Sequence, residues 1–228
     1  MQTEIRDTQR AFLLEWIIDV HRKFKLRPET LYVCQFIIDK FLSKHKTDSK
    51  QLHLIGVTTL LIGTKYEEIY PPDLKDFLHI SENKFTKPQV LAMEKQILQT
   101  LDFNVTAPSA YRFLQRYRSL SDVLNDDEVF FFAQYVLEIS LLEASFLAFK
   151  PSMLSAASII LSAKMLKKQD PWTKEIEQIT SYSRKDLEEV VKEVKLFCQE
   201  INPKFISILK YKFSKSEYKK VSNYEFKF

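Results

Sequence analysis

Glycine is almost missing from this sequence, and its scarcity limits the folds that the chain can adopt. Only two glycines occur in 228 residues, Gly56 and Gly63, and both lie inside one apolar run at 52–63. Tight hairpins and phosphate-binding loops need glycine where other residues would be strained, whereas helices do not. The sequence therefore predicts an all-α protein, and neither GxGxxG nor GxxxxGK(S/T) can be written with these two glycines.

Hydrophobic periodicity divides the chain into two series of five helices. Hydrophobic residues make up 45% and charged residues 28%, which is typical of a globular protein. The length of 228 residues allows one large domain or two of about 100 residues each. Pro28 and Pro88 suit first helical turns, Thr86 suits an N-cap, and Pro108 separates the series. The helices are expected at 8–26, 27–45, 49–66, 72–80 and 86–103, then at 109–118, 126–141, 151–166, 173–181 and 183–201.

The third helix of each series is the richest in small residues. The sequence GVTTLLIGTK at 56–65 corresponds in this respect to SAASIILSAK at 155–164. Small side chains allow neighbouring helices to approach closely, so close packing is expected around both. The first helix is apolar on nearly every side between Ala11 and Val20, and we expect neighbours to bury it all round.

The sequence contains no arrangement of residues that is typical of catalysis or of metal binding. The histidines do not pair with one another or with a cysteine at metal-ligand spacing, and no hydrolase or kinase motif occurs. Cys34 and Cys198 fall in helical apolar patterns, which indicates core positions and a reducing compartment. We therefore expect no catalysis, metal, cofactor or membrane span. The four histidines are His21, His45, His53 and His79.

Two charged segments follow the apolar patterns. The stretch TKYEEIYPPDL at 64–74 places charges directly after the most apolar helix, where Pro71 and Pro72 forbid its continuation. It is either a surface cap or a docking point. The basic stretch KYKFSKSEYKK at 210–220 is interpreted as a solvated end of the chain.

Four blocks of the sequence, in order and at the right separations, resemble the cyclin family. They are QRAFLLEWIIDV at 9–20, IIDKFLS at 37–43, residues 52–77 and residues 85–103, with weaker likeness at 150–161 and 210–222. The mitotic A and B types are the most similar. The resemblance implies two tandem five-helix cyclin boxes, at 1–104 and 105–203, followed by a basic tail at 204–228.

This resemblance also implies a function. A cyclin is a non-catalytic regulatory subunit that binds and activates a cyclin-dependent protein kinase, here expected to act at G2/M in the nucleus and cytoplasm. Mitotic cyclins carry a disordered N-terminal region with a destruction signal. This sequence begins a few residues before the first box, so we expect a trimmed chain or a cyclin whose abundance is controlled in another way.

The family assigns roles to particular positions of the first box. Lys65 and Glu94 are the expected polar contacts to the kinase, and Arg10 and Asp39 the expected internal ion pair. Leu54 completes the five signature positions. Glu67 and Glu68 are assigned to local structure. The apolar contacts expected around the charged pair are Ile62, Tyr66, Leu98, Phe103 and Val105, each of which could instead be simple core packing.

In many cyclins the first helix also forms a groove for substrates and inhibitors that carry an Arg-x-Leu motif. Asp19 keeps an acid able to meet the arginine of such a ligand, and Lys40 replaces the usual arginine. Gln9, Phe12 and His53 replace the usual methionine, isoleucine and glutamine, which makes one wall more polar and another bulkier. The matching positions are Gln9, Phe12, Leu13, Trp16, Asp19 and His53.

Two other classes of protein are compatible with paired boxes of this kind. One is a transcription factor that grips nucleic acid, but the formal net charge of +4 is weak for phosphate neutralisation and no zinc ribbon precedes the first box, so no nucleic acid is expected as a partner. The other is a cyclin whose kinase serves transcription. The block YEEIYPPDL favours the mitotic types over this alternative.

Overall fold

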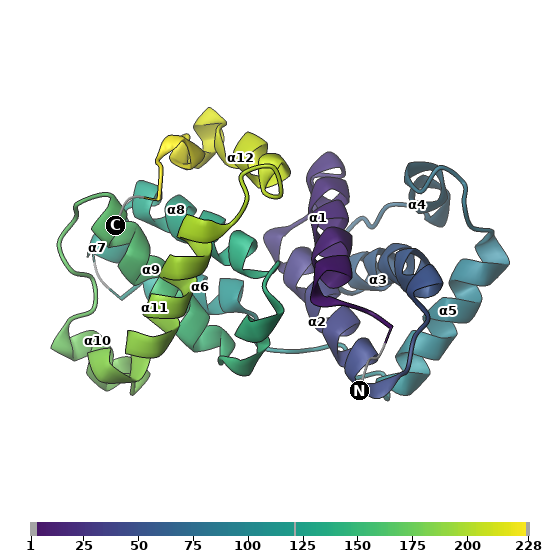
Figure 1. Ribbon diagram of the computed structural model, residues 1–228, viewed down its shortest axis with the longest axis horizontal. Helices are drawn as coiled ribbons and strands as arrows, with labels where there is room; N and C mark the ends of the chain where they lie inside the picture. Colours follow the sequence, from purple (N-terminus) through teal and green to yellow (C-terminus); the bar gives the residue numbers. More distant parts are fainter. Residues whose placement is uncertain (1–3, 121, 227–228) are drawn as a thin grey trace. The chain divides into compact units, whose positions relative to one another are not determined.

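The computed structural model describes residues 4–120 and 122–226, and within these ranges the protein contains helices and no strand (Figure 1). The all-α prediction is confirmed. The chain forms two compact units, Met1–Ala107 and Pro108–Phe228, so the division lies shortly after the predicted boundary at residue 104.

The first unit is built around one central helix. All five predicted helices are present, and α3 contacts each of the other four. Every residue from 55 to 64 is buried, as the small side chains of this helix led us to expect. The helices are α1 (Asp7–Lys23), α2 (Pro28–Lys44), α3 (Leu52–Glu67), α4 (Leu74–Ile80) and α5 (Lys87–Thr100), and a 3₁₀ turn at Ser49–Gln51 precedes α3.

The two glycines allow the neighbours of α3 to approach closely. A Cβ atom at Gly56 would lie 2.6 Å from Leu13 Cδ1 of α1, and one at Gly63 would lie 2.7 Å from Cys34 Sγ of α2. Both distances are too short for real carbon contacts. Glycine in α3 therefore serves helix packing rather than turns.

The second unit repeats this plan with α9 at its centre. Helix α9 contacts α6, α8 and α11, and every residue from 155 to 163 is buried. All five predicted helices are present, and α7 and α12 are additional. The elements are α6 (Ala110–Arg118), α7 (Asp122–Asn125), α8 (Asp127–Ser140), α9 (Pro151–Met165), α10 (Lys174–Thr180), α11 (Arg184–Glu200) and α12 (Ser207–Phe213), with 3₁₀ turns at Ala144–Ala148, Ser216–Tyr218 and Val221–Asn223.

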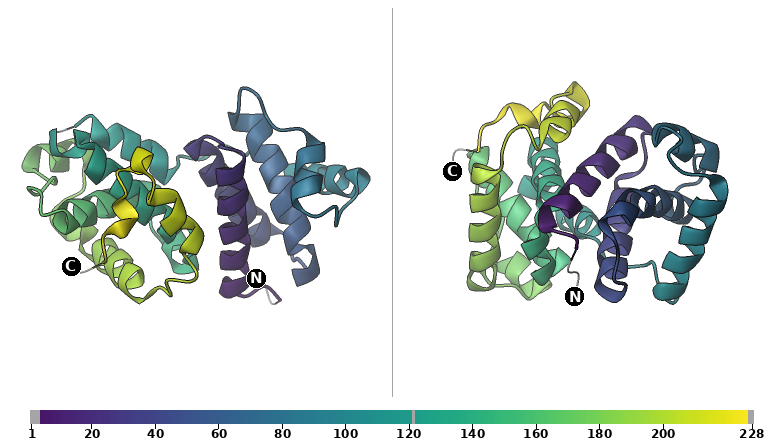
Figure 2. Two further views of the ribbon diagram at one scale, coloured as in Figure 1. Left: turned by 90° about the horizontal axis from the view of Figure 1, so that it is seen from above. Right: turned by 45° about the vertical axis from the view of Figure 1, so that its right-hand side comes forward.

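The C-terminal segment is part of the second unit, so its interpretation as a solvated tail is wrong. It folds back onto α8, as the yellow ribbon in Figures 1 and 2 shows. Phe213 and Val221 are fully buried. Lys212 is also buried, and its Nζ lies 2.6 and 2.7 Å from the two carboxylate oxygens of Glu138. The ring of Phe213 packs against Tyr135 of α8, and the buried Lys212 is neutralised by Glu138.

Helix α1 has an exposed face, so the expectation that neighbours bury it all round is also wrong. Leu14, Ile17 and Ile18 are buried, but the side chain of Phe12 is 57% exposed. Trp16 and Asp19 lie on the same face and are partly exposed.

Four helices, α1, α4, α5 and α9, end in the same kind of left-handed turn, and none has the glycine that commonly occupies it. At α9, Lys168 N donates to Ala163 O at 2.9 Å and Lys167 N donates to Lys164 O at 3.1 Å, which is the Schellman arrangement. Lys167 therefore takes a left-handed φ of 53°. This conformation is strained for a residue with a side chain. In the equivalent turns at the ends of α1, α4, α5 and α9, the left-handed residues are Lys25, Glu82, Asp102 and Lys167.

Candidate functional site

The charged pair predicted from the first box lies on the surface of the first unit. Lys65 stands in the last turn of α3 and Glu94 in the middle of α5. Lys65 Nζ donates to Glu94 Oε1 at 2.8 Å, with the lysine side chain 50% exposed and the glutamate 15%. The fold thus joins two residues that are 29 positions apart in sequence. The ammonium group of Lys65 is thus half-exposed, while the carboxylate that it contacts is largely buried.

Two of the predicted apolar contacts are exposed beside this pair. Tyr66 is 47% exposed and Phe103 is 69% exposed. The hydroxyl of Tyr66 lies 2.6 Å from Thr106 Oγ1, which ties the end of α3 to the segment after α5. Phe103 has a left-handed φ of 57°, directly after Asp102 at 51°. Such strain persists only where the surrounding structure holds it, and it turns Phe103 outward.

The other three predicted contacts lie deeper in the first unit. Ile62 and Val105 are buried in the core, and Leu98 is only partly exposed. For Ile62 and Val105 the burial fits the alternative of core packing that the sequence left open. Of the predicted apolar contacts, Tyr66 and Phe103 are the ones whose side chains are exposed.

Ile69 and Tyr70 are exposed residues that the sequence reasoning missed. Their side chains are 78% and 91% exposed, and both follow the end of α3. The sequence contained a signal for them. The two apolar residues stand between two glutamates and two prolines. Because prolines end the helix there, no continuing helical face can bury this pair.

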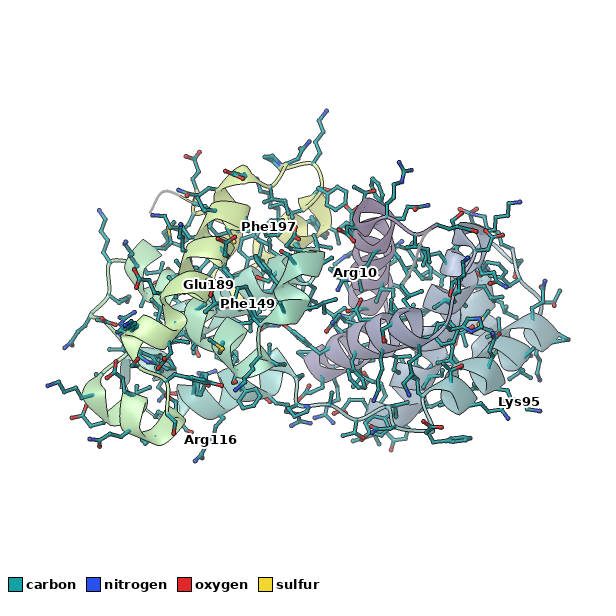
Figure 3. The ribbon with its side chains drawn as sticks, turned by 60° about the horizontal axis from the view of Figure 1, so that its bottom comes forward. Arg10, Lys95, Arg116, Phe149, Glu189 and Phe197 are labelled. Atoms are coloured by element: carbon teal, nitrogen blue, oxygen red, sulfur yellow. The ribbon has the colours of Figure 1, made fainter. Side chains whose placement is uncertain are left out.

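Arg10 and Asp39 meet inside the first unit. Arg10 Nε donates to Asp39 Oδ1 at 2.6 Å and Nη2 donates to Oδ2 at 2.8 Å, a bidentate pair that is largely buried. Gln35 adds a further hydrogen bond to the same carboxylate. The pair joins α1, on which Figure 3 labels Arg10, to α2. Leu54 is partly buried on α3.

The residues predicted to bind Arg-x-Leu motifs lie on the exposed face of α1 and the start of α3. Phe12 is exposed and Leu13 is buried against Gly56, while Gln9 is partly exposed. The rings of Trp16 and His53 meet edge to face with centroids 4.7 Å apart. Burial, and then Lys84, hold the pKa of His53 below its ordinary value although Glu82 opposes them, so the imidazole is neutral near pH 7.

Asp19 is already engaged by its own helix. Arg22 Nη2 and Lys23 Nζ lie 2.7 and 2.8 Å from its two carboxylate oxygens. Burial tends to raise the pKa of Asp19, but hydrogen bonds from Lys23 and Arg22 outweigh it and lower that pKa. A ligand arginine would therefore compete with two cations for this acid.

The described residues offer little to other chemistries. Among them, no group of three or more histidine, cysteine or acidic side chains could hold a metal ion. None of the helices in the same part of the chain is both long and apolar enough to cross a membrane. Burial raises the pKa of the Cys198 thiol to about 12, which disfavours the reactive thiolate.

Comparison with known proteins agrees with this geometry. Family models described as the cyclin N-terminal and C-terminal domains match residues 1–106 and 108–227. These matches define a protein with two tandem cyclin domains, and the chain belongs to the cyclin family. Cyclin-B1-4 of Arabidopsis thaliana is 38% identical over 95% of this chain and 56% of its own length. G2/mitotic-specific cyclin-A of Drosophila melanogaster is 35% identical over 98% of this chain and 45% of its own length.

The chain thus spans about half the length of the curated relatives that it matches. Among solved structures, a viral cyclin from herpesvirus saimiri superposes with a TM-score of 0.76 at 24% identity, over 87% of this chain and 88% of the viral chain. A chain of the yeast RNA Pol II CTD kinase CTDK-1 complex gives 0.69 at 13% identity, over 85% of this chain and 66% of that chain. At such identities the likeness establishes the fold.

Proposed function

We propose that this protein is a non-catalytic regulatory subunit that binds and activates a cyclin-dependent protein kinase. In this proposal it controls progression through G2/M in the nucleus and cytoplasm. It also recruits substrates that carry Arg-x-Leu motifs. One observation carries the kinase-binding part. Lys65 and Glu94 form an ion pair on the surface, and exposed Tyr66 and Phe103 flank it. Binding hot spots typically combine such aromatic anchors with a few polar groups.

The mechanism that we propose is a shift of the kinase's own conformational equilibrium. A mobile kinase helix that samples inward and outward positions is held inward by a partner that binds the inward state better. The cyclin contributes this differential affinity, and the kinase contributes the chemistry of phosphoryl transfer. The mitotic assignment is supported by relatives named as B-type cyclins and as a G2/mitotic-specific cyclin-A.

The charged pair can be tested by exchanging its two charges. The chain is reconstituted with candidate kinases, and phosphorylation of a histone-type substrate is measured for Lys65→Glu, Glu94→Lys and the double variant. Each single reversal should lower activation about 30-fold or more, because truncating one partner of an interface pair costs about 2–5 kcal/mol. The double variant can re-form the internal ion pair but presents reversed charges to a kinase. It should therefore stay inactive.

Lys95→Glu is the matched control, because Lys95 is an exposed lysine on the same helix as Glu94 (Figure 3). It should activate like the wild type. Three results would contradict the proposal: a wild-type chain that activates none of the kinases, folded single variants that activate normally, or a double variant that recovers activation.

The substrate-recruiting part has its own test at Trp16, whose ring lies on the exposed face of α1 against His53. Trp16→Ala should weaken binding of an Arg-x-Leu peptide about tenfold or more, since aromatic anchors carry much of the energy of such contacts. Kinase activation without the peptide should change little. Equal peptide affinity in both proteins, measured by fluorescence anisotropy, would remove this face as the recruiting site.

A further inference from the structure

The segment between α3 and α4 exposes two adjacent large apolar side chains. Ile69 and Tyr70 are largely exposed, and two glutamates separate them from Lys65 and Tyr66 along the chain. Ordering a flexible loop on binding costs free energy, so exposed contacts on such a segment contribute fully only if it is already held in shape.

Prolines restrict one half of this segment. Pro71 and Pro72 have fixed φ angles, and the residue before each proline is confined to extended conformations, which covers Tyr70. At the far end Asp73 caps α4, and its backbone N–H donates to Asp76 Oδ2 at 2.9 Å. The half that contains Ile69 has no proline to restrict it.

Glu68 holds this other half. It is the C-cap residue of α3 and has extended backbone angles. Its Oε1 accepts the backbone N–H of Arg27 at 2.8 Å and the hydroxyl of Thr30 at 2.5 Å. These contacts join residues about 40 positions apart in sequence. The side chain thus ties the end of α3 to the first turn of α2.

The N-terminus of α2 has its own acid in the first turn, Glu29, and Glu68 adds a second carboxylate from outside the helix. Its N-cap residue, Arg27, makes no side-chain capping bond. The first turn of a helix leaves N–H groups without partners and carries partial positive charge, so an acid placed there is stabilising. Thr30 is fully buried, which fixes the position of its hydroxyl. Glu68 therefore supplies from α3 the cap that α2 lacks.

We infer that Glu68 is a positioning residue for kinase docking: it clamps the start of the segment 68–73 to α2, so that Ile69 and Tyr70 are presented in a fixed conformation beside Lys65 and Tyr66. The clamp itself follows from the two hydrogen bonds of Glu68. Its role in kinase docking rests on the proposed function. Without the clamp, the segment must be ordered when the kinase binds.

The test is a titration of a fixed amount of kinase with the cyclin chain, which separates the half-saturating concentration from the plateau activity. Glu68→Ala should raise the half-saturating concentration about tenfold, equivalent to about 1.4 kcal/mol, and leave the plateau unchanged. Glu68→Gln keeps an acceptor oxygen and should fall between. Thr30→Val removes one donor and should add little in the Glu68→Ala background, because the two groups form one contact.

Two further variants separate positioning from general stability. Ile38→Val trims a fully buried side chain of α2 and should lower the Tm without moving the half-saturating concentration. Replacing Ile69 and Tyr70 together by serine should raise that concentration as Glu68→Ala does, with little change in Tm. If Glu68→Ala has no effect on it, or only the effect of Ile38→Val, the inference is wrong.

Amide hydrogen exchange distinguishes a failure of this inference from a failure of the proposed function. Glu68→Ala should speed exchange at 27–30 and 68–70 but not in α5, whether or not a kinase is activated. A wild-type chain that activates no kinase would end the proposed function and with it the docking role. Unchanged exchange at these amides would overturn the clamp itself.

Discussion

Lys212 and Glu138 show how strongly one residue can depend on another in this fold. Both side chains are buried, and Gln134 Nε2 also donates to Glu138 Oε1 at 3.0 Å. Removing one charge of a buried pair leaves the other without a partner in a poorly solvated site, which costs about 3–5 kcal/mol. Lys212→Met should therefore destabilise the protein by about that amount, as measured by urea unfolding.

The neighbouring Lys210→Met provides the control, because Lys210 is exposed on the same short helix and should change stability by less than about 0.5 kcal/mol. The variant Lys212→Met with Glu138→Gln should recover most of the loss. Equal stability of the two lysine variants would show that the buried pair contributes nothing.

Single residues were the hardest features to predict from the sequence. In KYKFSKSEYKK the six residues from 210 to 215 include three lysines with the same local pattern, yet only Lys212 turns inward. Its partner is 74 positions away, so no local signal marks it. Lys65 and Glu94 could be named through family resemblance alone, since their contact exists only once α3 packs on α5.

At the scale of helices, replacing a left-handed residue at a helix end by glycine should increase stability. Glycine adopts such a φ without strain, although it also increases the entropy of the unfolded chain. Lys167→Gly at the end of α9 should therefore stabilise the protein by about 0.5–1 kcal/mol. Thermal and urea unfolding measure the change.

The same substitution inside the helix should have the opposite effect. Lys164→Gly replaces an exposed residue of α9 and should cost about 1 kcal/mol. A Lys167→Gly variant that loses as much stability as Lys164→Gly would argue that the left-handed lysine is not strained.

These ends also explain where the predicted helix boundaries failed. The helices expected at 8–26 and 86–103 end at Lys23 and Thr100. Their stop positions are occupied by Lys25 and Asp102, which carry left-handed φ angles without a glycine in the sequence. The apolar periodicity continues beyond them, so a pattern-based prediction runs too far.

For the whole molecule, buried tyrosines of the second unit predict sensitivity to alkali. Burial is the main cause that raises the pKa of Tyr117 and of Tyr218 to about 12, from an ordinary 10.0, and it also raises the pKa of Tyr135. A folded-state pKa above the unfolded value means that the stabilisation is complete below pH 10 and is lost as the pH rises toward 12. The free energy of unfolding should fall across this range.

Alkaline unfolding followed by circular dichroism checks this expectation. Tyr117→Phe and Tyr218→Phe should each move the midpoint to higher pH, because one ionisable group is removed from the core. Tyr70→Phe, at the almost fully exposed Tyr70, is the control and should leave the midpoint in place. If all three variants unfold at the same pH, the sensitivity to alkali does not come from ionisation of Tyr117 and Tyr218.

The architecture of the molecule was largely predictable because it depends on patterns rather than on single contacts. Two series of amphipathic helices separated at Pro108, each with a central helix of small residues, specify the two units. The C-terminal segment was mispredicted because charge dominates its composition, while its burial depends on the aromatic contacts of Phe213 and its neighbours. Ile69 and Tyr70 were missed although their position between two glutamates and two prolines was a signal in the sequence.

The glycines of α3 have a mechanical consequence for the docking surface. Gly56 and Gly63 receive Leu13 of α1 and Cys34 of α2 at two heights about 10 Å apart along the helix. Sliding α3 by a single residue would bring a side chain into each of these notches. We therefore expect that α3 cannot slide along its axis within the first unit. Lys65 at its C-terminal end should then keep a fixed position relative to α1 and α2. If a kinase binds at the proposed site, we therefore expect most of the conformational adjustment to occur in the kinase.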